Sequence, residues 1–458
     1  MNKIIKLLPI TILNYFNSGH ERSNKAKKNI AISILIKGLS IFAGFLLVPL
    51  ALEYLDSTRY GIWLTLSSIL AWFGFFDIGL GNGLRNKFAE AKAKGDDKLV
   101  KTYVSTTYAI VTSIMFILFT LFLIVNKFLD WTKILNTPSS MKTDINNMVI
   151  VVFIFFCLRF VTKLLTNILL ADQKSGIRDS LDLISKLMNL GLIFLLLKTT
   201  EGSLFKLGFV YSVTPVFVLI IASFFFFTKY YSAYVPSIKY IDFKYSKDLM
   251  KLGFDFFIIQ IAAVIIYSTD NMIITQLFGP AEVTPYNIAY KYFGMAMMGF
   301  IIIVAPFWSA FTEAYAKNEF DWIKKSIKKL MGIWGIFAIG VLIMLIISNP
   351  FYEFWLNGKV EVPFNLSLLM AIFIVMQCWN TIFVHFINGV GKVKLQRNIA
   401  IVGALLNIPL SILFAKYLKM GISGVILATV VGTTIGIITS PLQYYLIINK
   451  KANGIWNK

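Results

Sequence analysis

The sequence predicts an all-α polytopic membrane protein with about twelve transmembrane helices arranged in two six-helix lobes. Three observations lead to this fold class. The chain of 458 residues is 57% hydrophobic and only 15% charged, whereas soluble domains carry about 25% charged residues. Apolar runs of about 20 residues, long enough to cross a bilayer, recur from one end to the other. Lysines and arginines gather in the short segments between these runs.

The apolar runs follow one another without a polar stretch long enough to form a separate soluble domain. We expect spans at residues 30–52, 60–83, 103–126, 147–170, 179–198, 204–228, 252–277, 285–312, 329–350, 365–388, 398–416 and 421–447. Because the number of spans is even, both chain ends are expected on the same side of the membrane.

The distribution of positive charge predicts which side that is. Segments on the side of the termini contain 30 lysines and arginines, against nine in the loops of the opposite side. Cytoplasmic loops of membrane proteins are enriched in Lys and Arg, so both termini are expected in the cytoplasm. The formal net charge of +21 therefore reflects membrane topology and contact with anionic lipids, and not binding of nucleic acid.

The chain is expected to divide near its middle into two related halves. The expected parts are a cytoplasmic amphipathic segment (1–29), a first lobe (30–228), a cytoplasmic linker (229–251), a second lobe (252–447) and a cytoplasmic tail (448–458). Lys174 precedes Asn189 by the same spacing as Lys392 precedes Asn407, which is one of two weak echoes between the halves. Equivalent spans share an orientation, so the repeat is parallel. Transporters commonly have such a layout and bind substrate between the halves.

Several charged residues fall inside the expected spans, where each costs about 2.5–3.5 kcal/mol at a helix centre. Such positions usually have a partner charge, a water-filled cavity or a ligand. These residues are Lys37, Asp77, Arg159, Lys163, Asp182, Lys186, Asp255, Asp270 and Lys291.

The cations among them suggest a binding site for an anion. Arg159 and Lys163 lie one helical turn apart, and two like charges on one face require an anion or water nearby. We therefore expect a cationic cavity that suits a phosphate or pyrophosphate. The candidate substrate-binding residues are Lys37, Arg159, Lys163, Lys186 and Lys291. Simpler interpretations remain open, since Lys37 and Lys186 could extend toward the headgroups and Asp182 could pair with Lys186.

The acidic residues have similar alternatives. Asp255 could be a charge favoured at a helix N-terminus, and Asp270 could belong either to a polar interior patch or to an ion relay. His385 is expected as a hydrogen-bonded packing residue, and Cys157 and Cys378 as small buried hydrophobic residues. The sequence contains no phosphate-binding loop, metal-ligand spacing or nucleophile motif, so neither a cofactor nor an enzyme activity is expected.

One stretch carries a family resemblance. The run from Tyr60-Gly61-Ile62-Trp63 to Phe76-Asp77-Ile78-Gly79-Leu80-Gly81, followed by Arg85, resembles the Wzx-like polysaccharide-unit flippases. These proteins belong to the multidrug/oligosaccharidyl-lipid/polysaccharide (MOP) exporter superfamily. The resemblance covers essentially the whole chain and implies a fold like that of the MATE exporters. It assigns Asp77 and Arg85 as motif residues, and with Asp255 and Asp270 they are expected to act in gating or ion coupling.

The resemblance also implies a task and a place. The expected substrate is an oligosaccharide unit linked to undecaprenyl pyrophosphate, moved from the cytoplasmic to the periplasmic or outer face of the bacterial plasma (inner) membrane. The units would serve synthesis of O-antigen, capsule or exopolysaccharide, with a polysaccharide polymerase and a chain-length regulator as partners. Alternating access of the two lobes, coupled to an ion gradient, would move them.

Two alternative functions remain. A cation-coupled multidrug exporter of the same superfamily would need an acidic cavity, and the surplus of Lys and Arg opposes it. A membrane polymerase or ligase would need a large outer loop with catalytic residues, and the longest expected outer loop, residues 127–146, is short for that purpose.

Overall fold

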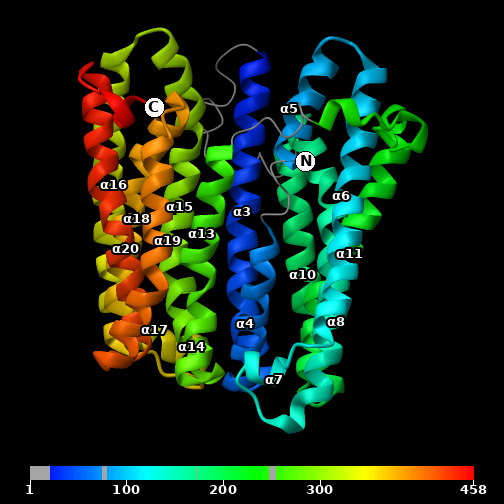
Figure 1. Cartoon of the computed structure of the whole chain (residues 1–458), viewed down its shortest axis with the longest axis vertical. Coiled ribbons are helices and arrows are strands. Elements are labelled where there is room, and N and C mark those ends of the chain that lie inside the picture. Colours follow the sequence, from blue (N-terminus) through cyan, green and yellow to red (C-terminus); the bar gives the residue numbers. More distant parts are fainter. Residues whose placement is uncertain (1–20, 75–79, 173, 247–253) are drawn as a thin grey trace.

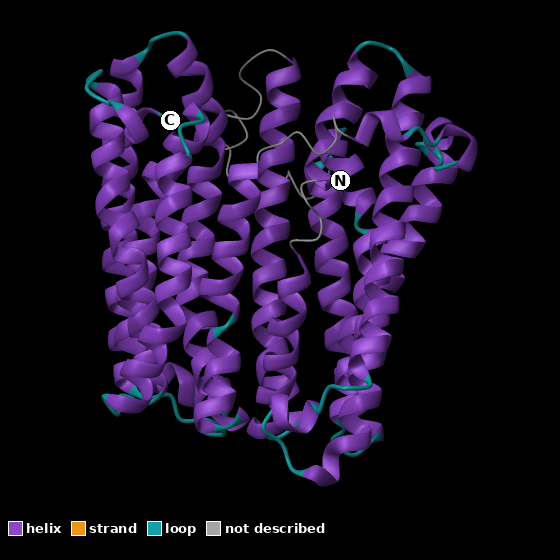
Figure 2. Cartoon of the chain, viewed as in Figure 1, coloured by secondary structure: helices purple, strands orange, loops and turns teal. Residues whose placement is uncertain are grey.

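The computed structural model describes residues 21–74, 80–172, 174–246 and 254–458. These residues form helices joined by short loops, with no strand among them (Figure 2). Figure 1 shows two groups of helices side by side, with α3 and α4 at the boundary between them. We call the face that holds the C-terminus the terminal face, and the opposite one the far face.

The helices of the first lobe begin and end at the following residues: α3 Glu21–Tyr54, α4 Ser57–Trp72, α5 Leu80–Ala93, α6 Asp97–Asn126, α7 Trp131–Ile134, α8 Lys142–Thr162, α9 Leu164–Ala171, α10 Ser175–Thr199 and α11 Leu204–Lys229. The short turns η3 (Ser232–Tyr234), η4 (Ile238–Tyr240) and η5 (Phe243–Tyr245) lie in the linker. The second lobe contains α13 Phe254–Ser268, α14 Asp270–Phe278, η6 Pro280–Glu282, α15 Val283–Ala316, α16 Phe320–Ile346, α17 Ser348–Leu356, α18 Phe364–Val390, α19 Lys394–Ile412 and α20 Ile422–Ile448.

The predicted membrane architecture is confirmed. Eleven helical segments in the described part of the chain are long and apolar enough to cross a membrane. The remaining expected span, 60–83, is described only in part, because residues 75–79, among them Asp77, lie outside the described residues. Large apolar side chains cover the outside of the bundle; Phe116, Phe224 and Leu405 are 70%, 75% and 71% exposed. Such a surface is suited to lipid, and not to water.

The structure differs from the expected segments in several places. Helix α3 begins at Glu21, before the expected start of the first span at residue 30, and residues 1–20 of the expected amphipathic segment lie outside the described residues. The fourth span breaks at Lys163 between α8 and α9, and the seventh at Thr269 between α13 and α14. Short helices α7 and α17, which were not expected, occupy the loops after α6 and α16 at the far face.

The packing of the helices confirms the parallel repeat. Five packed helix pairs of the first lobe have a counterpart in the second: α3·α10 with α13·α19, α8·α11 with α18·α20, α10·α11 with α19·α20, α6·α8 with α16·α18, and α5·α6 with α15·α16. Asn189 and Asn407, which the sequence paired, are both buried, on the equivalent helices α10 and α19.

Side-chain caps fix where several helices begin. The Asp56 carboxylate accepts a hydrogen bond from the backbone N–H of Arg59 at 2.8 Å, and Asp96 accepts one from Leu99 at 2.9 Å. These bonds satisfy backbone donors that have no partner within the first helical turn. Gly391 ends α18 with a φ of 75°, a conformation that side chains disfavour. The chain therefore reverses direction tightly at both faces.

At the terminal face, the first part of the linker packs onto the first lobe. Tyr231 is 2% exposed and donates a hydrogen bond to Asp172, which also pairs with Lys92 and Lys174. Burial alone would raise the pKa of Asp172, but the hydrogen bonds from Lys174, Lys92 and Tyr231 together hold it below its ordinary value. The backbone N–H of Asp242 bonds to Thr106 on α6 at 3.0 Å. These contacts join the linker to the first lobe.

Candidate functional site between the two lobes

The two lobes touch through α4 of the first lobe, which packs against α13, α14, η6 and α15 of the second. The hydroxyl groups of Thr65 and Thr275 lie 2.7 Å apart, and Thr284 donates to the carbonyl of Ser57 at 2.7 Å. The amide of Asn136 donates to the carbonyl of Thr275 at 2.9 Å. Among the described residues, the hydrogen bonds between the lobes all lie in the half of the molecule toward the far face.

Gly61 makes this contact possible. A Cβ atom at this position would lie only 1.7 Å from the carbonyl oxygen of Pro280, so only glycine allows the two backbones to approach so closely. A second contact between the lobes is made by Phe45 of α3, which stacks on Trp355 of α17 with ring centroids 3.7 Å apart. The structure is therefore closed between the lobes on the far-face side.

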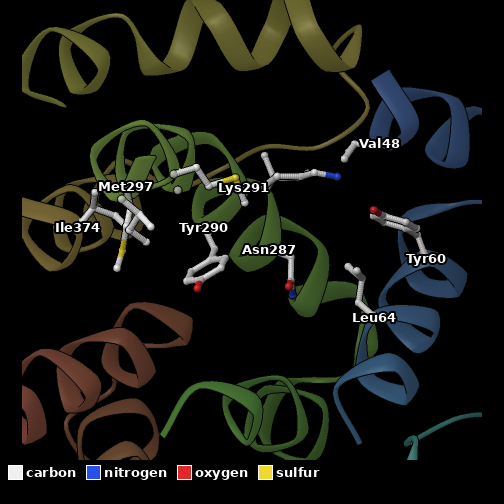
Figure 3. Close-up of a pocket in the computed structure, with 12 residues that line it drawn as sticks. Val48, Tyr60, Leu64, Asn287, Tyr290, Lys291, Met297 and Ile374 are labelled. Carbon is white, nitrogen blue, oxygen red and sulfur yellow. The ribbon is translucent and has the colours of Figure 1, made fainter. Parts of the chain in front are cut away.

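A cavity of about 350 Å³ lies between the lobes behind this contact. Val48, Tyr60 and Leu64 of α3 and α4 form one wall (Figure 3). Asn287 and Lys291 of α15 lie on the opposite wall, where the Lys291 side chain extends toward Val48. Most of the lining is apolar, so Lys291 provides the cationic group of this cavity.

Two of the predicted cations approach each other across the boundary between the lobes, and a third lies in the first lobe. Lys291 of α15 is close enough to Lys186 of α10 for the two ammonium groups to interact electrostatically, across the boundary between the lobes. Arg159 of α8 interacts in the same way with Asp182 of α10. Arg159 lines a second cavity of about 260 Å³ with Trp63 and Tyr211, within the first lobe among α4, α8 and α11.

The carboxylate between these cations is firmly held. Lys186 pairs with Asp182 at 2.8 Å, so the simpler interpretation that the sequence left open for these two residues holds. Ser40 of α3 donates a hydrogen bond to Asp182 at 2.6 Å and accepts one from Lys186 at 2.7 Å. Asp182 therefore keeps α3 and α10 together and orients Lys186, but it neutralises only part of the charge of Arg159, Lys186 and Lys291.

The other expected cations lie apart from this group. Lys37 pairs with Asp179 at 3.9 Å, and Arg178 approaches the same carboxylate at 3.1 Å, nearer the terminal face. Lys163 is exposed at the junction of α8 and α9, and Arg85 is exposed on α5.

Asp270 is buried in the second lobe. It begins α14, is 3% exposed and accepts a hydrogen bond from Tyr286 at 2.5 Å. The hydroxyl of Thr429 on α20 lies 3.4 Å from the same carboxylate oxygen, and Asn407 donates to Thr429 at 3.0 Å. The other oxygen, Oδ1, is buried without a hydrogen-bond partner. No described Lys or Arg pairs with Asp270, and the side chain of Asp255 lies outside the described residues.

Sequence reasoning missed the neutral partners at these sites. Ser40 and Thr429 are uncharged polar residues within apolar runs, and Tyr286 lies at the start of one, beside Asn287; such residues are common on membrane helices. A hydroxyl group that meets a charged residue of another helix is far from it in the sequence, so no spacing along the chain reveals the pair. The predicted packing role of His385 agrees with its position, because its ring contacts Trp308 edge-on and Nδ1 lies 2.9 Å from the carbonyl of Thr381.

Comparison with known proteins shows the family of the chain. The family model described as polysaccharide biosynthesis protein matches residues 26–312, more than half of the chain. The chain belongs to this family.

The chain is also similar to two bacterial proteins over most of their length. A candidate O-antigen transporter of Salmonella typhi is 24% identical, over 91% of this chain and 94% of its own length. A candidate O-antigen export protein of Yersinia pseudotuberculosis is 23% identical, over 78% of this chain and 81% of its own.

Solved structures confirm the fold of this polysaccharide biosynthesis family member. It is similar to an inward-facing multidrug resistance MATE family transporter of the MOP superfamily, with a TM-score of 0.69 at 12% identity over 92% of this chain and 95% of the other. An outward-facing MATE structure gives 0.68 at 13% identity, over 93% and 96%. The expected MATE-like fold is therefore confirmed.

Proposed function

We propose that this protein is a flippase. It moves oligosaccharide units linked to undecaprenyl pyrophosphate from the cytoplasmic to the periplasmic or outer face of the plasma membrane, for synthesis of surface polysaccharide. The observation that carries the proposal is the pair of Lys186 and Lys291, which lie close enough across the boundary between the lobes to interact electrostatically, with Lys291 in the wall of the cavity there. Arg159 adds a third cation in a cavity of the first lobe. Family membership and the O-antigen transport names of the relatives support it.

The chemistry of the cleft suits a pyrophosphate. Guanidinium and ammonium groups bind phosphate oxygens through charge-assisted hydrogen bonds, which are stronger in a partly buried cleft than in water. Without such a site, the sugars and phosphates would have to lose their water to cross about 30 Å of hydrocarbon. The polyprenyl chain needs no such site, because it can stay in the lipid.

The arrangement of the lobes suits alternating access. The lobes are in contact toward the far face, and we assign the terminal face to the cytoplasm because the positively charged loops lie there. The structure then corresponds to a state that receives substrate from the cytoplasm. Rocking of the lobes would separate α4 from η6 and α14 and release the substrate on the other side.

Asp270 is our proposed ion-coupling residue. A buried carboxylate with one unpaired oxygen, held by Tyr286 and Thr429, can take up a proton or a small cation, and this would relieve the cost of its buried charge. Asp77, Asp255 and Arg85 remain proposed gating or coupling residues from the sequence motif and span positions.

Deletion of the gene in its bacterial host tests the function. We expect surface polysaccharide to be lost and lipid-linked oligosaccharide to accumulate on the inner face of the membrane, because synthesis continues but transfer stops. Mass spectrometry of extracted lipids measures the accumulation, and the intact gene on a plasmid should reverse it. Normal polysaccharide together with increased drug sensitivity would contradict the proposal and favour the multidrug alternative.

A D270N variant tests ion coupling. Asn keeps the shape of Asp270 but cannot carry a negative charge or be neutralised by an ion, so we expect delivery of surface polysaccharide to fall about tenfold or more. In the wild-type protein, an ionophore that collapses the ion gradient should reduce delivery of surface polysaccharide. In D270N the ionophore should have little further effect. The control is D321N, at the exposed start of α16. Full delivery by D270N would exclude Asp270 from coupling.

A further inference from the structure

The second lobe contains a cavity whose chemistry differs from that of the cationic cleft. It has a volume of about 140 Å³ and lies among α13, α18, α19 and α20. No charged side chain is among its lining residues in the described part of the chain. Amide and hydroxyl groups line it instead, from Gln377, Asn380, Gln396, Thr433, Ser440 and Gln443.

Several of these amides have atoms without a hydrogen-bond partner. Oδ1 of Asn380 and Oε1 of Gln396 are buried without a hydrogen-bond partner, and Nε2 of Gln377 makes no hydrogen bond of regular geometry, although the Tyr267 hydroxyl is near it. Gln377 is only 7% exposed. Burying an amide atom without a partner is unfavourable, and these three come from two helices that line one cavity. Their arrangement indicates a polar ligand that supplies the missing hydrogen bonds.

The amide cavity adjoins the cavity between the lobes. On α18, Ile374 lines the cavity between the lobes, and Gln377, one helical turn further on, lines the amide cavity. Tyr267 of the amide cavity and Tyr290 of the other are close enough to interact electrostatically, and they are 42% and 44% exposed. A ligand held by Lys291 at one end can therefore reach the amide cavity with a neighbouring group.

The lining selects for one class of ligand. A primary amide both donates and accepts hydrogen bonds, as a sugar hydroxyl does, whereas a phosphate is only an acceptor and is better bound by cations. The Tyr267 ring offers an apolar face with a polar tip, which suits the mixed surface of a sugar ring. The volume is that of about a single ring, with no room for an oligosaccharide.

We propose that the amide cavity binds an uncharged sugar ring of the lipid-linked unit, next to the pyrophosphate held by Arg159, Lys186 and Lys291. This inference rests on the proposed flippase function and deepens it. Two sites then recognise the substrate. The cations bind the pyrophosphate, which all such substrates share, and Gln377, Asn380 and Gln396 form hydrogen bonds with the sugar.

A binding experiment with the full-length protein in lipid nanodiscs tests the proposal. The probes are bare undecaprenyl pyrophosphate and the lipid-linked oligosaccharide fraction extracted from the deletion strain. The original protein should bind the glycosylated lipid about tenfold more tightly than the bare one, the scale of one or two net hydrogen bonds. A Q377L/N380L variant should bind both equally, because its cavity keeps a similar volume but loses the amides. Q396M, in a separate helix, should lose part of the preference.

The outcomes separate the two proposals. Unchanged binding of bare undecaprenyl pyrophosphate by Q377L/N380L shows that the variant is folded. If that variant keeps the tenfold preference, the amides contact water only and the sugar site is wrong, while the flippase proposal stands. If the original protein binds neither lipid, the flippase proposal fails and the sugar site fails with it.

Discussion

An R159Q/K291Q variant is expected to reduce delivery of surface polysaccharide at least about tenfold. Lys291 lies in the second lobe and Arg159 in the first, so the variant removes positive charge from both lobes and should weaken pyrophosphate binding. A hydrogen bond to a charged group contributes about 1.5–3 kcal/mol, and 1.4 kcal/mol corresponds to a factor of ten in binding. Lipid-linked oligosaccharide should accumulate on the inner face, as it does after deletion of the gene. Quantified surface polymer per cell gives the measurement.

A matched control separates charge at the cleft from charge in general. K206Q/K359Q removes two exposed lysines and causes the same change in net charge. It should deliver polysaccharide normally. The anion-binding role of the cleft would be refuted if R159Q/K291Q, present at normal level in the membrane, exported as well as K206Q/K359Q.

The second large effect is expected at Gly61. In G61A, the new methyl group would lie 1.7 Å from the Pro280 carbonyl oxygen, so α4 and η6 cannot approach as they do here. The lobes should then remain apart toward the far face, and transport should stop although the protein inserts normally. Polysaccharide delivery should fall at least about tenfold, since the transporter cannot complete its cycle without closing this contact.

Chemical labelling can show the reason for the loss. A cysteine at Leu64, on the wall of the cavity between the lobes, should react faster with a membrane-impermeant maleimide from outside in G61A than in the original background. The native Cys157 and Cys378 are buried and interfere little. G191A is the control, because a methyl group there meets no atom within 4 Å. Normal export by G61A would mean that this close contact is not part of the cycle.

The membrane fold could be predicted from the sequence because the bilayer imposes a simple rule. Every backbone polar group in hydrocarbon must be paired within a helix, so each crossing requires a long apolar run. The parallel repeat was also visible, in part through Asn189 and Asn407. The breaks at Lys163 and Thr269 were not, because each depends on how a helix end packs against other helices.

For the candidate site, the sequence predicts which charged residues belong to it but not how they are arranged in space. Isolated charges in apolar runs pointed to Arg159, Lys186 and Lys291, since burial of a charge is costly wherever it lies. Their grouping depends on contacts between distant parts of the chain: Ser40 meets Asp182 142 residues away. The amides of the second lobe escaped notice because a neutral polar residue costs less and is common in membrane helices.

The excess of positive charge in the cleft has a consequence for the energy source of the proposed cycle. With pyrophosphate bound, the cations and the anion nearly cancel, so the step that carries substrate outward moves little net charge. Without substrate, the returning cleft is cationic, since Arg159, Lys186 and Lys291 outnumber Asp182. A membrane potential that is negative inside draws such a charge toward the cytoplasm, with about 2.3 kcal/mol per elementary charge for each 100 mV. The membrane potential would thus drive the return of the empty carrier to its cytoplasm-facing state. Net charge would cross the membrane in this return step and not in the step that moves the substrate.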